Sequence, residues 1–101
     1  MALPDLDPAQ PLTSARQELF CCRMACWGTT NHNASDHYLS AGFRSSSGRT
    51  GANRLAYTLL GKQNVKNRIA YLSAQELQVR QHLLAEAEER VRVLLTEESS
   101  A

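Results

Sequence analysis

The chain has 101 residues, of which 43% are hydrophobic and 6% aromatic, and its formal net charge is +1. This length fits one small domain with extensions, and no stretch approaches the roughly 20 apolar residues of a membrane span. Three cysteines are odd in number and too few for a disulfide framework. The amino terminus lacks the basic start and apolar run of a secretory signal. A reducing cytosol is the expected compartment.

The small net charge conceals an uneven distribution along the chain. Residues 1–15 carry −2, residues 16–72 carry +6 and residues 73–101 carry −3, which sum to +1. A basic centre between acidic ends indicates a domain that binds a polyanion, with a separate tail. The alternative explanation is a solvated surface whose charge happens to be uneven.

The first elements in chain order are an arm and a buried helix. Residues 1–11 contain three prolines and are expected to form a flexible arm. A helix then begins after Ser14, which matches a capping box with Gln17, and runs to about Trp27. Its apolar residues cover more than one face, so we expect it to be the central, most buried helix of the domain.

Two short helices about a glycine corner are predicted between Asn33 and Leu60. Asn33 caps the first helix, which stops at Gly42 because glycine readily takes the left-handed conformation. The second helix has one apolar stripe, made of Ala52, Leu55, Ala56, Leu59 and Leu60. Its opposite face carries Thr50, Arg54 and Tyr57, with Asn53 on the flank. A buried stripe backed by hydrogen-bonding and cationic side chains is what a DNA recognition helix requires, although many surface helices share the pattern.

A fourth helix is predicted after Gly61, with Asn64 as its cap. One face of this helix carries Val65, Ile69 and Leu72. Lys66 and Arg68 lie off that stripe, so we expect them to face solvent or phosphate.

The carboxy-terminal segment, residues 74–95, is amphipathic and helical. Ser73 and Glu76 match a capping box, so a fifth helix begins there unless residues 64–95 form one long helix. Residues 12–72 already supply four short helices for a core of about 60 residues, which makes the later stripe surplus to that core. We expect the stripe to pack against neighbouring copies, with folding back onto its own domain as the alternative. It consists of Leu77, Leu83, Leu84, Ala87, Val91, Leu94 and Leu95.

Metal and catalytic chemistry have weak support in the sequence. Cys22, Cys26, His32 and His37 match no common spacing of structural zinc ligands. Cys21 and Cys22 are typical of small buried hydrophobic residues. The glycines give neither nucleotide-binding spacing, and His37 lacks a nucleophile in a defined geometry. We therefore expect no metal, no cofactor and no catalytic residue.

The order and spacing of several short motifs resemble the small terminase subunits of tailed bacteriophages. The motifs are Leu12-Thr13 with Gln17-Glu18-Leu19-Phe20, Asn33-Ala34 leading to Ala41-Gly42-Phe43, Leu59-Leu60, and Asn64-Val65-Lys66-Asn67-Arg68-Ile69 with Leu72. The resemblance implies an all-α domain with a helix-turn-helix that binds the viral packaging site on double-stranded DNA, in the cytoplasm of the bacterial host. It also implies a homo-oligomeric ring that presents DNA to the large terminase subunit, which holds the ATPase and nuclease. The loop around Ser45-Ser46-Ser47-Gly48 is longer than in the shorter members of the family.

The sequence thus predicts a non-catalytic DNA-binding subunit of a phage packaging motor. The expected fold is all-α, with a helix-turn-helix bundle of four short helices over residues 12–72 and an amphipathic oligomerisation helix with a frayed tail over 73–101. Groove contacts are expected from Thr50, Asn53, Arg54 and Tyr57, and phosphate contacts from Arg44, Arg49, Lys62, Lys66 and Arg68. The alternatives are a helix-turn-helix transcriptional regulator that dimerises through residues 74–95, and a helical adaptor whose basic centre binds an acidic protein.

Overall fold

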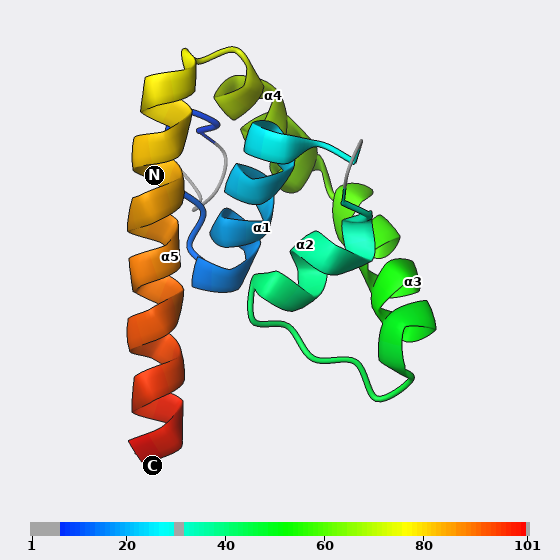
Figure 1. Ribbon diagram of the computed structural model, residues 1–101. Helices are drawn as coiled ribbons and strands as arrows, with labels where there is room; N and C mark the ends of the chain where they lie inside the picture. Colours follow the sequence, from blue (N-terminus) through cyan, green and yellow to red (C-terminus); the bar gives the residue numbers. More distant parts are fainter. Residues whose placement is uncertain (1–6, 30–31, 101) are drawn as a thin grey trace.

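The secondary structure is helical throughout the computed structural model, which describes residues 7–29 and 32–100. The helices are α1 (Ala15–Trp27), α2 (Ala34–Ser40), α3 (Gly48–Leu60), α4 (Gln63–Ser73) and α5 (Leu77–Ser100) (Figure 1). The described residues contain no strand, which confirms the all-α class expected from the sequence.

Local capping signals set the first two helices where the sequence predicts them. The Ser14 hydroxyl accepts a hydrogen bond from the N–H of Gln17 at 3.3 Å, which satisfies a free N–H group at the start of α1. Before α2, the carboxylate of Asp36 accepts from the N–H of Asn33 at 2.9 Å. Gly42 follows α2 with a φ of 98°, a left-handed conformation that costs glycine little.

The later helix boundaries differ from the sequence prediction in two places. α4 begins at Gln63, so Asn64 lies inside its first turn and not at the capping position. Ser73 is the last residue of α4 and α5 begins at Leu77, so the capping box predicted at Ser73 does not form. Residues 64–95 are therefore parts of two helices separated by a short turn.

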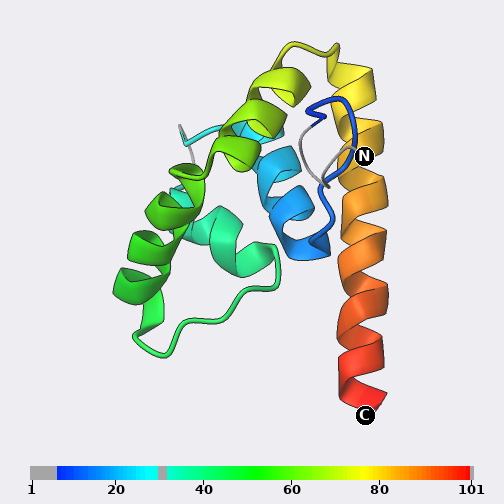
Figure 2. The same cartoon turned by 180° about the vertical axis from the view of Figure 1, so that it is seen from behind.

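α1 is the central helix, as its wide apolar surface predicts. It contacts α2, α4 and α5, and its residues Leu19, Phe20 and Cys21 are buried. α5 lies along one side of α1, while α2 and α3 lie on the other (Figures 1 and 2). The other elements contribute Leu12, Ala34, Tyr38, Ala52, Ala56, Leu59, Val65, Leu72, Leu84, Ala87 and Val91 to the same core.

α5 packs antiparallel to α1 within the same chain. Near the start of α5, Arg80 donates a hydrogen bond to the carbonyl of Ala25 at 2.9 Å. Near its end, Glu98 forms an ion pair with Arg16 at 2.6 Å. Because Ala25 and Arg16 lie near opposite ends of α1, the long helix covers α1 along its length (Figure 2).

The carboxy-terminal helix contributes to the core, so its apolar stripe is not surplus to the core as the sequence predicts. Leu84, Ala87 and Val91 are at most 8% exposed and form one cluster with the apolar side chains of α1. α1 needs this cover because its apolar residues point in more than one direction. The three side chains are unavailable to a neighbouring copy in the folded chain, so the predicted assembly is left with Leu77, Leu83, Leu94 and Leu95.

A buried ion pair joins α1, α4 and the segment before α1. The Arg68 guanidinium donates to both carboxylate oxygens of Glu18, with an Nε–Oε1 distance of 3.0 Å and an Nη2–Oε2 distance of 2.8 Å. Glu18 also accepts from the N–H of Leu12 at 3.0 Å, and Arg68 donates to the carbonyl of Pro8 at 2.9 Å. The described part of the predicted flexible arm, residues 7–11, is thus bonded to the domain.

α2 and α3 contact each other and are joined by residues 41–47. This connection is longer than the roughly three or four residues of a standard helix-turn-helix turn. α3 buries Ala52, Ala56 and Leu59, whereas Leu55, predicted on the same stripe, is 41% exposed at its edge. α3 lies on the side of the molecule away from α5, so its outward face is open (Figures 1 and 2).

Candidate nucleic-acid interface

The outward face of α3 carries the side chains that are predicted to contact DNA bases. Thr50, Asn53 and Arg54 are exposed, and Tyr57 is 61% exposed. A helix of this length is about 20 Å long and presents its donors and acceptors along one side, a shape that fits the major groove. The structure therefore brings these four side chains together on one accessible surface.

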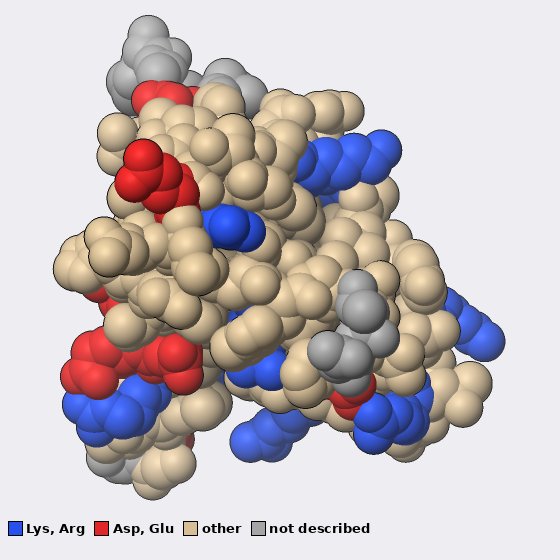
Figure 3. Space-filling model, turned by 45° about the horizontal axis from the view of Figure 1, so that its top comes forward, with Lys and Arg blue, Asp and Glu red and all other residues tan. Residues whose placement is uncertain are grey.

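Four further exposed cations lie at the start of α3 and on the segments that flank it. Arg44 lies in the loop before α3, Arg49 in its first turn, Lys62 in the turn after it and Lys66 on α4, and all four are exposed. Residues 37–75 contain no acidic residue, whereas residues 76–101 contain six glutamates. Figure 3 shows blue side chains along the α3–α4 side of the molecule and most of the red over α5. We define the α3 face as Arg44, Arg49, Thr50, Asn53, Arg54, Tyr57, Lys62 and Lys66.

Arg68 does not belong to the α3 face. Its side chain is 1% exposed and is paired with Glu18, which is 2% exposed, so the prediction that Arg68 contacts phosphate is wrong. Arg68 follows Val65 by three residues and precedes Leu72 by four, which places it on the buried side of α4. That spacing, together with a glutamate inside the apolar first helix, is the sequence signal for the buried pair.

A polar hollow of about 570 Å³ lies between the start of α2 and the outward face of α3. Beside it, Arg49 on α3 forms an ion pair with Asp36 on α2, whose other carboxylate oxygen bonds to the N–H of Asn33. Asp36 is the only acidic residue between positions 19 and 75, so one negative charge interrupts the α3 face. The lining residues are Thr29, Asn33, Ala34, Ser35, Arg49, Thr50, Asn53 and Tyr57.

His37 holds the junction between α1 and α2 beside this hollow. Its Nε2 donates at 2.6 Å to the carbonyl of Gly28, the residue that ends α1. Because a carbonyl only accepts, Nε2 carries the proton, and Nδ1 is buried with no hydrogen-bond partner among the described residues. The ring of Trp27 stacks on the imidazole, with centroids 6.1 Å apart. A neutral imidazole therefore ties α2 to the end of α1.

We expect the free energy of unfolding to fall in acid because burial lowers the pKa of His37 below its ordinary value of 6.5. The hydrogen bond to Gly28 opposes this change in pKa, while the charges of Arg23 and His32 add to it. Below pH 6.5, His37 therefore binds a proton more readily in the unfolded chain than in the folded chain. Stability is full above pH 6.5 and is lost as the pH falls toward the lower folded-state pKa. Urea unfolding between about pH 8 and pH 5 measures this loss.

Two histidine variants test whether His37 is the group responsible. His37→Gln keeps a donor for the Gly28 carbonyl but cannot titrate, so most of the acid-induced loss should disappear. His82 is the matched control, since it is exposed and pairs with Glu86 on the surface of α5. His82→Gln should retain the loss. An undiminished loss in His37→Gln would assign the pH dependence to another group.

The structure confirms the interpretation of Cys21 and Cys22 as small buried residues. Cys21 and Cys22 are buried, and Cys26 is half-buried. Burial raises the pKa of the Cys21 and Cys22 thiols. A protonated thiol is a poor nucleophile and metal ligand. Within the described residues, no three or more His, Cys, Asp and Glu side chains are grouped so that they can hold a metal ion.

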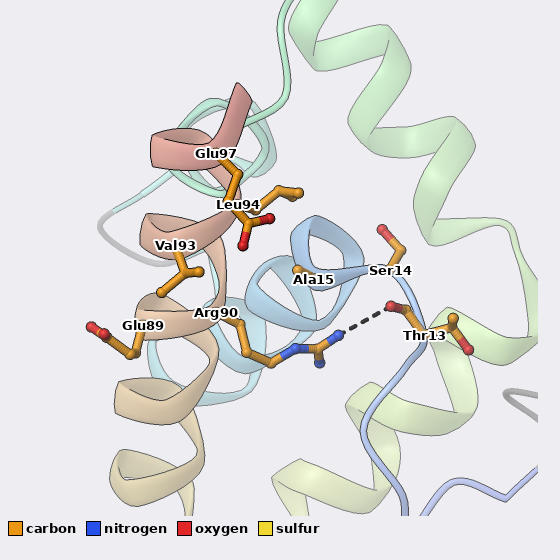
Figure 4. A pocket seen from close by; sticks show the side chains of 8 residues that line it. All are labelled: Thr13, Ser14, Ala15, Glu89, Arg90, Val93, Leu94 and Glu97. Carbon is orange, nitrogen blue, oxygen red and sulfur yellow. Dashed lines mark hydrogen bonds between the residues drawn. The ribbon is translucent and has the colours of Figure 1, made fainter. Parts of the chain in front are cut away.

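A second, more apolar hollow of about 580 Å³ lies between the start of α1 and the carboxy-terminal half of α5. Figure 4 shows Arg90 reaching from α5 to the Thr13 carbonyl, where the Nη2–O distance is 3.0 Å. Arg90 also donates to the Leu12 carbonyl at 3.2 Å. Leu94 of the predicted oligomerisation residues lines this hollow, and Leu77 and Leu95 are exposed elsewhere on α5. Assembly through α5 stays a prediction.

Comparison with known proteins finds no matching protein-family model, curated protein or solved structure. None of the described helices combines the length and the apolar character that are needed to cross a membrane.

Proposed function

We propose that this chain is the non-catalytic DNA-binding small subunit of a phage genome-packaging terminase. In this role it recognises the viral packaging site and presents DNA to the large subunit, which holds the ATPase and nuclease. The observation that carries the proposal is the α3 face, where hydrogen-bonding side chains on one helix are accompanied by five exposed cations, namely Arg44, Arg49, Arg54, Lys62 and Lys66. The resemblance of residues 12–72 to small terminase subunits supports the packaging role.

The side chains of the α3 face divide into two kinds of contact. Arginine pairs with guanine and asparagine with adenine through two hydrogen bonds each, so Arg54 and Asn53 are suited to read base edges in the major groove. The cations before and after α3 are suited to phosphates, which fix the position of the protein without reading sequence. Ring assembly would present several such faces to one DNA molecule and raise the affinity through multivalency.

We expect DNA binding to weaken steeply with salt, and the Lys66→Ala substitution to reduce the log–log salt slope by about 0.9. Lys66 is exposed on α4, so its replacement should leave the core intact. Arg54→Ala should instead reduce the difference in affinity between packaging-site DNA and random DNA, because a base contact is lost. Fluorescence anisotropy with labelled duplexes over a range of salt concentrations measures both effects.

Arg92→Ala is the matched control for Lys66→Ala. Arg92 is an exposed cation on α5 that pairs with Glu89, so its removal changes the net charge equally but leaves the α3 face intact. Its salt slope should match that of the unmodified protein. Absence of binding by the intact chain at low salt would refute the DNA-binding proposal. The mass of the intact assembly distinguishes the two candidate functions. A packaging subunit is expected to form a ring, whereas a transcriptional regulator is expected to form a two-fold dimer.

A further inference from the structure

A single carboxylate interrupts the positive charge of the α3 face. We propose that Asp36 attenuates the DNA binding of this face by holding Arg49 in an ion pair within the chain, so that Arg49 contributes no net charge toward DNA. The inference rests on the proposed DNA-binding function and goes beyond it. It makes Asp36 a residue that limits the sequence-independent part of the affinity for DNA.

The geometry holds the Asp36 carboxylate in place from both sides. One oxygen accepts from the Arg49 guanidinium and the other accepts from the N–H of Asn33 at 2.9 Å. The side chain of Asp36 is 26% exposed, whereas that of Arg49 is 64% exposed. The aspartate is therefore the fixed partner, and the long arginine side chain is the one that can move.

Movement of Arg49 toward a phosphate would not remove the negative charge. An exposed ion pair is weak, so a DNA phosphate can compete for the guanidinium. Once Arg49 leaves, however, the Asp36 carboxylate stays bonded to Asn33 and faces the approaching phosphates without its cation. In either arrangement, five exposed cations and one carboxylate give the face an effective charge of +4.

The consequence of this arrangement is weaker electrostatic binding to DNA of every sequence, including DNA without the specific site. Phosphate contacts supply essentially all of nonspecific binding and carry no sequence information. A carboxylate that cancels one cation lowers binding to every sequence, while contacts from Asn53 and Arg54 to base edges still distinguish the correct site. Asp36 is thus expected to limit retention of the protein on DNA that lacks its site.

Two substitutions that break the same ion pair separate this inference from a structural role. Asp36→Asn leaves Arg49 free and keeps an oxygen acceptor for the Asn33 N–H, so a random-sequence DNA duplex should bind roughly five- to tenfold more tightly at low salt. Its log–log salt slope should steepen by about 0.9. Arg49→Gln leaves Asp36 unpaired, and both affinity and slope should decrease. The double variant restores the charge of the face and should bind as the unmodified protein does.

Glu89→Gln controls for net charge, because it removes one negative charge from the outer surface of α5. Its salt slope should stay unchanged, and thermal melting should show all variants folded. If Asp36→Asn binds random DNA with the same affinity as the unmodified protein, the inference is wrong but the proposed function still stands. A double variant as weak as Arg49→Gln would also overturn the inference, by showing that removal of the Asp36 charge does not strengthen DNA binding. Loss of affinity in both single variants would assign the pair a structural role, and absence of binding by the unmodified chain would remove the proposed function as well.

Discussion

Replacing Arg68 with methionine is expected to lower the free energy of unfolding by about 3–5 kcal/mol. The substitution keeps much of the side-chain volume but leaves the buried Glu18 carboxylate without its cation and the Pro8 carbonyl without its donor. A buried charge without a partner is costly because the protein interior does not replace the lost hydration. Urea unfolding followed by circular dichroism measures the effect as a lower midpoint at constant slope.

Two further variants separate the charge of Arg68 from its packing. Lys66→Met, an exposed position on the same helix, should change the free energy of unfolding by less than about 0.5 kcal/mol. Adding Glu18→Met to Arg68→Met removes both charges and should recover most of the loss, since apolar replacement of a buried pair is often neutral. If the loss in the double variant instead equals the sum of the losses in Glu18→Met alone and Arg68→Met alone, packing and not charge explains the effect.

Ending the chain at Ser73 is expected to abolish cooperative folding, because α5 is part of the core. Burial of a leucine or valine contributes about 1.5–3 kcal/mol, and α5 buries both Leu84 and Val91. The face of α1 beneath them would also become exposed. These losses together approach the roughly 5–15 kcal/mol by which a domain of this kind is stable. Far-ultraviolet circular dichroism should show little helix and no sharp thermal transition.

A chain that ends at Thr96 is the matched control for this truncation. It keeps Leu84, Ala87 and Val91 and loses the Arg16–Glu98 ion pair, which lies at the surface. Such a pair contributes at most about 1 kcal/mol, so this shorter chain should melt cooperatively. A sharp melting transition in the chain that ends at Ser73 would instead show that residues 12–72 close a core alone. α5 would then be free to pack on neighbouring copies.

Most of the candidate interface could be predicted because it depends on neighbours in the chain. Thr50, Asn53, Arg54 and Tyr57 share one side of a helix by spacing alone, and that side is exposed as the pattern predicts. The pairing of Asp36 with Arg49 could not be read in the same way. It depends on how α2 and α3 approach each other across residues 41–47, a connection whose path the sequence does not reveal.

Local sequence signals were enough to predict the all-α class, the starts of α1 and α2 and the central place of α1. These follow from capping side chains, from glycine and from apolar spacing, which act over a few residues. The burial of Arg68 and the packing of α5 depend instead on contacts between distant parts of the chain. Arg68 meets Glu18 from fifty positions away, and a guanidinium can lie in the core only where such a partner satisfies it. The spacing of the α5 stripe suits its own domain and another copy equally, because apolar burial has no direction. In the folded chain the stripe packs on the apolar surface of α1, and that surface is formed only by the tertiary structure.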